Sequence, residues 1–144
     1  MKSFDRTLIF DFGTSNTRVC EDGHIIFDEP TEISYFSNGD IRIGNKARGF
    51  YSMHYEVVNP IVNGYVNDYD AFEIYVKRLV KKLVRFPRLC LKTVVIAFPN
   101  DLVGDENASV CDRAFFEPFR RMGIKDIRTV HKGVALSLST IANK

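Results

Sequence analysis

The first thirty residues alternate short apolar runs with polar turns, which is the pattern of an antiparallel meander. Strands are predicted over residues 7–12, 17–21 and 24–27. The segment Glu21-Asp22-Gly23 separates the last two and is a hairpin turn signal. The run Asp28-Glu29-Pro30 is expected to end this unit.

Residues 30–68 contain four glycines and short apolar runs, so we expect a small, loop-rich insertion there. Two short strands, 32–36 and 40–43, are predicted around the turn Ser37-Asn38-Gly39-Asp40. A short helix is predicted over residues 46–53.

Beyond residue 68 the apolar positions take a helical spacing. Asp70 is a plausible helix cap, and Phe72, Val76, Leu79 and Leu83 recur at i, i+4, i+7 and i+11. The opposite face of the predicted helix is basic and carries Lys77, Arg78, Lys81, Lys82 and Arg85.

The last third of the chain alternates strands and helices. Residues 93–98 are apolar and rich in β-branched side chains, which is typical of a buried parallel strand. A helix is predicted over residues 105–122, ended by Gly123 and kinked by Pro118 at a cost of about 3 kcal/mol unless the surroundings compensate. A strand over 126–130 and a helix over 133–142 complete an α/β layout with a mixed sheet.

Composition adds mainly exclusions. With 144 residues, 45% hydrophobic and 26% charged, the chain is predicted to be one soluble globular domain. Its three cysteines, Cys20, Cys90 and Cys111, are odd in number and far apart, so no disulfide framework is implied. We expect no signal peptide and no membrane span, and hence a cytoplasmic location.

The turn after the first strand carries the candidate chemistry. A glycine and several hydroxyl or amide residues in a tight turn can point backbone N–H groups into one concavity, which suits a phosphate. Asp11, at the end of the strand, would hold Mg²⁺ through water. The candidate nucleotide-binding residues are Asp11, Gly13, Thr14, Ser15, Asn16 and Thr17. The alternative is a hairpin turn that binds no ligand.

Five segments in order resemble the actin-like ATPase superfamily, and within it the bacterial rod-shape MreB family. Asp11-Phe12-Gly13-Thr14-Ser15-Asn16-Thr17 resembles the first phosphate loop, and Asp28-Glu29-Pro30-Thr31-Glu32-Ile33 resembles the "NEPS" segment. Ile43-Gly44-Asn45-Lys46-Ala47 resembles "VGxxA". Two further segments resemble "RPxxxGVIxD" and "VVIxVP", namely residues 59–68 and 94–99. The resemblance implies a ribonuclease-H-like core, equivalent to the first of two family domains, with a small inserted subdomain.

Departures from the family pattern bear on ATP hydrolysis. Family members are much longer, and their second half supplies another phosphate loop and the adenosine pocket. In the family an "EEP" tripeptide supplies a glutamate that orients the attacking water, whereas this chain has His131-Lys132-Gly133. A protonated lysine cannot accept the proton of that water. Pro118 also interrupts a helix that is regular in the family. We therefore expect no ATPase activity from this chain alone, and weak or no binding of ATP and Mg²⁺.

A second candidate site is the segment that follows the basic helix. Residues 74–100 carry seven basic residues and no acidic one. Exposed apolar side chains beside basic ones favour an anionic membrane surface, at about 1 kcal/mol per basic residue. The family resemblance also implies membrane contact at about this place. The candidate contact residues are Phe86, Leu89, Leu91, Lys82, Arg85 and Arg88. The alternative is a solvated basic face followed by a loop whose leucines fill the core.

Other site chemistries are disfavoured. The aromatic residues Phe72 and Tyr75 lie on or near the core face of the basic helix, so stacking on nucleic acid is not expected. His24, His54 and His131 show no metal-ligand spacing with each other or with the cysteines.

The resemblance implies an actin-like cytoskeletal protein related to cell shape, acting through contacts with itself or with a longer actin-like partner. It could join a filament end, cap it or pair with a separate second half. One rival is a nucleotide-binding ATPase whose cleft is completed by dimerisation or a partner chain. Another is a gene remnant that folds without a function.

Overall fold

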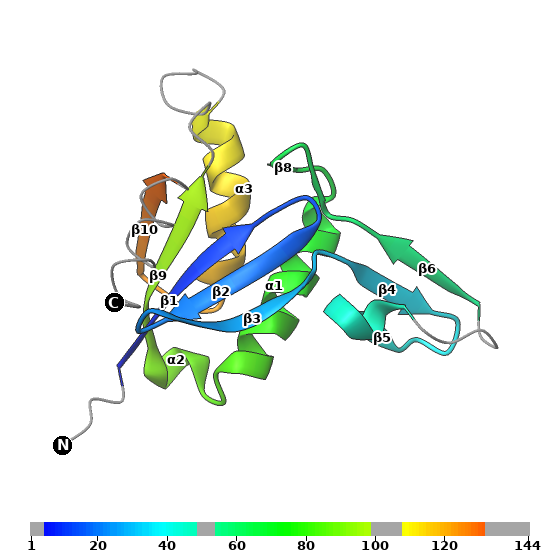
Figure 1. The fold of residues 1–144 in the computed structure, drawn as a ribbon, viewed down its shortest axis with the longest axis horizontal. Coiled ribbons are helices and arrows are strands. Elements are labelled where there is room, and N and C mark those ends of the chain that lie inside the picture. Colours follow the sequence, from blue (N-terminus) through cyan, green and yellow to red (C-terminus); the bar gives the residue numbers. More distant parts are fainter. Residues whose placement is uncertain (1–4, 49–53, 99–107, 132–144) are drawn as a thin grey trace.

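A five-stranded mixed sheet forms the centre of the computed structural model, which describes residues 5–48, 54–98 and 108–131. The strand order is β10-β9-β1-β2-β3, with β1 paired in parallel to β9 and antiparallel to β2 (Figure 1). The strands are β1 (Arg6–Phe12), β2 (Asn16–Glu21), β3 (His24–Pro30), β9 (Leu91–Phe98) and β10 (Asp126–His131). The predicted meander and the parallel strand are confirmed, although β3 continues to Pro30 instead of ending at Phe27.

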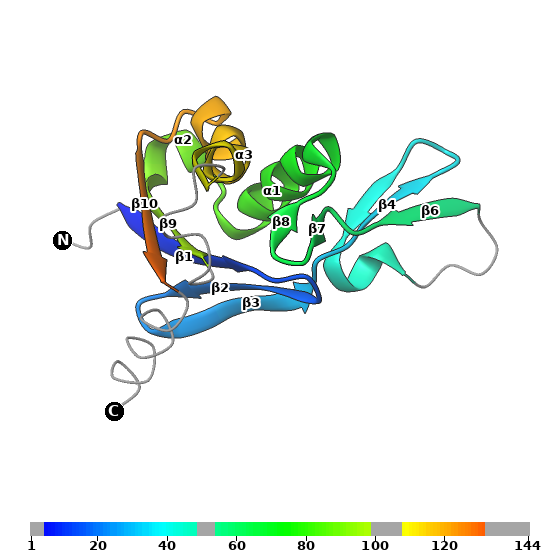
Figure 2. The same cartoon turned by 90° about the horizontal axis from the view of Figure 1, so that it is seen from above.

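Two long helices, α1 (Tyr69–Leu83) and α3 (Ala108–Arg121), lie on the same side of this sheet (Figure 2). Alternation along β1 turns Leu8, Phe10 and Phe12 towards the helices, and each is almost fully buried. A short helix, α2 (Pro87–Cys90), links the α1 end to β9.

The centre of the core is aromatic. The Phe12 ring lies 5.0 Å from that of Phe72 on α1, edge to face, and 5.5 Å from that of Phe10. The rings of Phe115 and Phe119 on α3 complete the group, with Phe119 4.9 Å from Phe10. These contacts bind sheet and helices into one core.

The start of α1 differs by two residues from the prediction. Asp68, not Asp70, is the N-cap, and its carboxylate accepts a hydrogen bond of 3.0 Å from the Ala71 N–H. Asp70 lies in the first turn, where a negative charge interacts favourably with the positive end of the helix dipole. The predicted apolar face is otherwise confirmed, since Phe72, Val76 and Leu79 are fully buried and Leu83 is partly buried against the core.

A smaller three-stranded sheet extends to one side of the main body (Figure 1). Its order is β5 (Ile41–Ile43), β4 (Ile33–Phe36) and β6 (Tyr55–Val58). A single 3₁₀ turn, η1 (Gly44–Ala47), follows β5, and Arg48 after it is extended. The helix predicted over 46–53 is therefore wrong at Arg48, and its remainder at 49–53 lies outside the described residues.

A tight hairpin connects this sheet to α1. Strands β7 (Ile61–Val62) and β8 (Tyr65–Val66) pair around Asn63-Gly64, and both turn residues have positive φ. At the other end of the chain, Pro118 lies buried within α3, and Gly123 with φ +88° follows that helix as predicted. The predicted start of that helix at 105–107 and the predicted helix over 133–142 lie outside the described residues.

Candidate functional site

The turn between β1 and β2 is closed by one backbone hydrogen bond, from the Gly13 N–H to the Asn16 carbonyl at 3.0 Å. Gly13 is required here for space, because a Cβ at this position would lie 2.6 Å from the Asn16 oxygen. We call residues 13–16 the phosphate loop, after the role that the sequence predicts for it.

Neighbouring segments hold the other three carbonyls of the phosphate loop. The Thr31 hydroxyl donates to the Gly13 carbonyl at 2.7 Å, and the Thr31 N–H donates to the Ser15 carbonyl at 2.9 Å. The Asn59 amide donates to the Thr14 carbonyl at 2.8 Å. Every carbonyl from Gly13 to Asn16 therefore accepts a hydrogen bond from the protein.

The N–H groups at the tip of the phosphate loop are placed differently. Thr14, Ser15 and Asn16 are exposed. Within residues 5–48, 54–98 and 108–131, the N–H groups of Thr14 and Ser15 donate no hydrogen bond. A turn with engaged carbonyls and available amides has the donor set that an anion such as phosphate needs.

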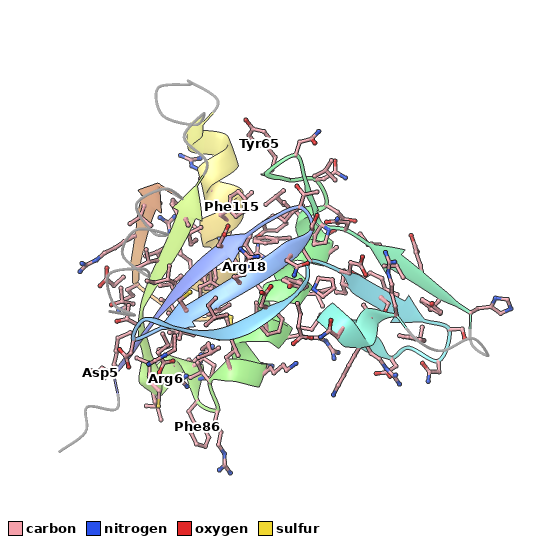
Figure 3. The ribbon with its side chains drawn as sticks, in the orientation of Figure 1. Asp5, Arg6, Arg18, Tyr65, Phe86 and Phe115 are labelled. Atoms are coloured by element: carbon pink, nitrogen blue, oxygen red, sulfur yellow. The ribbon has the colours of Figure 1, made fainter. Side chains whose placement is uncertain are left out.

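Asp11 lies one strand position before the buried Phe12 and turns towards the face of the sheet opposite α1 and α3. It is paired in register with Arg18 on β2, which Figure 3 shows near the middle of the sheet. Its Oδ1 atom is buried. Burial, and then the charge of the nearby Asp11 carboxylate, raise the pKa of the Cys20 thiol. A carboxylate oxygen at this position fits a hard cation such as Mg²⁺.

The side chain of Asn16 is held away from the loop tip. Its amide donates to the Asp28 carboxylate at 2.9 Å, and this hydrogen bond, with the charge of Arg18, holds the pKa of Asp28 below its ordinary value. The side chain of Asn16 therefore joins β2 to β3.

Thr17 requires a correction. The sequence placed it among the ligand-contacting residues, but it is fully buried and its hydroxyl lies 2.8 Å from the Thr31 hydroxyl. A side chain enclosed in this way cannot touch a ligand at the loop tip, so Thr17 supports the phosphate loop from within.

Only some of the predicted membrane-contact residues are exposed in the structure. Phe86 is 55% exposed and Leu89 is 70% exposed, and Figure 3 shows Phe86 pointing away from the body. The Arg85 guanidinium lies 5.3 Å from the Phe86 ring centre, and Arg88 is exposed.

Leu91 and Lys82 are placed differently from the exposed Phe86 and Leu89. Leu91 is only 2% exposed because β9 begins there and inserts the side chain into the core, so its prediction as a contact residue is wrong. The Lys82 ammonium lies 3.2 Å from the Glu29 carboxylate and 5.4 Å from the Phe27 ring centre. Both partners belong to β3, so the ammonium contacts that strand.

No described helix is long and apolar enough to cross a membrane. Across 5–48, 54–98 and 108–131, no cluster of three or more His, Cys, Asp or Glu side chains forms a metal-binding group. The residues Lys132 and Gly133 of the tripeptide discussed above lie outside the described ranges.

Comparison with known protein families matches residues 5–140 to the MreB/Mbl protein family. The chain belongs to this family. Among solved structures, this MreB/Mbl chain is similar to MreB 5 of Spiroplasma citri in a crystal structure with bound AMPPNP, with a TM-score of 0.65 and 17% sequence identity. The match covers 90% of this chain and 39% of that one, so this chain spans about two fifths of the length of MreB 5. The predicted family and the predicted actin-like fold are both confirmed.

Proposed function

We propose that this MreB/Mbl chain is a cell-shape-related cytoskeletal protein that acts through contacts with itself or with a longer actin-like protein. The main support for this proposal is the phosphate loop within an MreB-type sheet. Its carbonyls accept hydrogen bonds from the protein, and two of its N–H groups are available. We further propose that the loop binds the phosphates of ATP weakly, with Asp11 towards Mg²⁺, and that the chain alone does not hydrolyse ATP.

Two features support weak binding without hydrolysis. The exposed tip leaves a phosphate bound there open to water on its outer side, and good ligand sites enclose most of their ligand. Lys132 replaces the glutamate that the family resemblance implies for orienting the attacking water. The structural similarity to MreB 5, which binds AMPPNP, supports the choice of an adenine nucleotide as ligand.

The test is a thermal-unfolding titration of the 144-residue chain with Mg-ATP, beside a phosphate-release assay. A ligand that binds only the folded state stabilises it by about 2.7 kcal/mol at 100-fold excess over Kd. We expect saturable stabilisation at millimolar Mg-ATP that Asp11→Ala removes, and no phosphate release above that variant. Glu56→Ala is the matched control, because it removes an exposed carboxylate from β6.

The other outcomes are informative. Asp11-dependent phosphate release would replace this proposal with the rival ATPase, whose cleft a second copy or a partner chain completes. If Mg-ATP does not stabilise the chain at all, the proposed nucleotide binding is refuted, and the proposal of a purely structural protein remains.

A second proposed function, membrane contact at the inner face of the membrane, is favoured by the exposed pair Phe86 and Leu89 beside Arg85 and Arg88. Fully burying a side chain of this size is worth about 1.5–3 kcal/mol, and each nearby basic residue adds about 1 kcal/mol on an anionic surface.

We expect the chain to float with anionic liposomes and less with neutral ones. The double variant Phe86→Ser/Leu89→Ser is expected to lower the bound fraction at least about tenfold, since two burial contributions are lost. The matched control is Val62→Ser/Tyr65→Ser, which removes the exposed apolar pair of the β7–β8 hairpin. Equal flotation with both lipid types, or an equal loss in the control, would contradict membrane contact through this segment.

A further inference from the structure

Thr31 connects the phosphate loop to the interior of the protein. It lies in the link between β3 and β4 and is fully buried. Its N–H and its hydroxyl donate to the carbonyls of Ser15 and Gly13, two residues apart in the loop. A single side chain and its own backbone thus hold both sides of the turn.

The direction of the hydroxyl hydrogen bonds follows from counting protons. A threonine hydroxyl has one hydrogen, and a backbone carbonyl can only accept. The hydrogen of Thr31 is therefore used on the Gly13 carbonyl at 2.7 Å. It follows that Thr17 is the donor in the 2.8 Å contact between the two hydroxyls. The result is a directed chain from Thr17 to Thr31 to the Gly13 carbonyl, enclosed in the core, where such chains strengthen each bond.

This chain bears on how the loop meets a ligand. Because the carbonyls are engaged by Thr31 and Asn59, the N–H groups of Thr14 and Ser15 are the backbone groups that face outwards at the tip. A loop that already has this arrangement does not have to reorganise when an anion arrives.

We propose that Thr31 is a positioning residue of the phosphate loop, fixing its carbonyls inward so that its amides are presented to a phosphate group. The proposal rests on the proposed function for the ligand, but the geometry that it claims exists in the free chain. A buried threonine that merely fills space between β3 and β4 would leave the loop unchanged when its hydroxyl is removed.

The experiment compares Thr31→Val, which keeps the shape and removes the hydroxyl, with Thr31→Ser, which keeps the hydroxyl. Amide hydrogen exchange is measured without nucleotide, at the Gly13 N–H, which is bonded to Asn16, and at the Val84 N–H, which is bonded to Val80 at the end of α1. In Thr31→Val we expect exchange at Gly13 to rise at least about tenfold relative to Val84. Thr31→Ser should restore the original ratio. Thr129→Val, at an exposed position on β10, is the control and should change neither amide.

Unchanged exchange at Gly13 in Thr31→Val, or no restoration in Thr31→Ser, would overturn the proposal. If Thr31→Val does not fold, Thr17→Val carries the test, because it removes the hydrogen bond donated to Thr31 and leaves the Thr31 hydroxyl in place. A smaller rise in exchange at Gly13, about threefold, supports the directed chain, and no rise overturns the proposal. Mg-ATP affinity is measured in parallel, and Thr31→Val should weaken it about tenfold. A wild-type chain that binds no Mg-ATP refutes the proposed ligand, while the exchange ratio still decides the role of Thr31.

Discussion

Replacing Phe12 with alanine is expected to destabilise the folded chain by about 3–5 kcal/mol, the largest effect that we predict for a single substitution. Phe12 is 2% exposed, and its ring contacts the rings of Phe10, Phe72 and Phe115. The substitution removes these contacts and leaves a cavity between the sheet and both long helices. Guanidinium-induced unfolding followed by circular dichroism measures the change.

Two variants calibrate this result. Phe12→Leu keeps most of the volume and should cost less than half as much, with the remaining loss coming from the aromatic contacts. Phe86→Ala removes the same side chain from an exposed position and should stay within about 0.5 kcal/mol of wild type. A small cost for Phe12→Ala would mean that the core is not organised around this ring.

The second large effect is expected at Gly13. Gly13→Ala brings a Cβ to 2.6 Å from the Asn16 carbonyl oxygen, a backbone atom that cannot move without opening the turn. We expect a loss of stability of about 2 kcal/mol and at least about a tenfold loss of Mg-ATP affinity, because the hydrogen bond from Gly13 to Asn16 must lengthen. Thermal unfolding with and without Mg-ATP reports both quantities.

Ser15→Ala is the control for Gly13→Ala, since it changes an exposed side chain in the same turn and leaves the backbone free to keep its shape. It should leave stability within about 0.5 kcal/mol. If Gly13→Ala and Ser15→Ala change stability and Mg-ATP affinity equally, the loop is less rigid than the hydrogen bonds from Thr31 and Asn59 imply.

Much of the main sheet could be predicted because its signals are local. The alternation along β1 and the Asp22-Gly23 turn give strand and hairpin without reference to the rest of the chain. The helix α1 was also predicted, but its cap was placed on Asp70 instead of Asp68. Both residues are aspartates just before an apolar repeat, and only the three-dimensional path of the backbone decides which one is extended.

The small sheet was harder to predict. Strand β6 and the hairpin β7–β8 were absent from the sequence expectations, because their apolar runs are short and their partners lie elsewhere in the chain. β6 pairs with β4, about twenty residues earlier, and β7 with β8 over two residue pairs only. Stability in such strands comes from cross-strand neighbours, which a single-sequence pattern does not contain.

The candidate site was predicted in part. The sequence drew attention to the turn after β1, but residue type alone could not separate Ser15, which is exposed, from Thr17, which is buried. Leu91 was assigned to the surface for the same reason, since the start of β9 was not recognised. Thr31 was noticed only as part of a family-like segment. Its hydrogen bonds to Gly13 and Ser15 join residues sixteen to eighteen positions apart, and the nearest signal available was that β3 follows directly on β2.

The sheet order also determines when the protein can become stable during synthesis. Of the described strands, β1 is made before the others. The β2 hairpin can close on one of its edges at once, but its other edge waits for β9, some eighty residues later. Helix α3, which packs on Phe10 and Phe12 through Phe119, is made later still. At about 5–20 residues per second the ribosome needs several seconds to supply those segments. The nascent chain therefore passes through an interval with an open strand edge and an uncovered aromatic face, when molecular chaperones matter most.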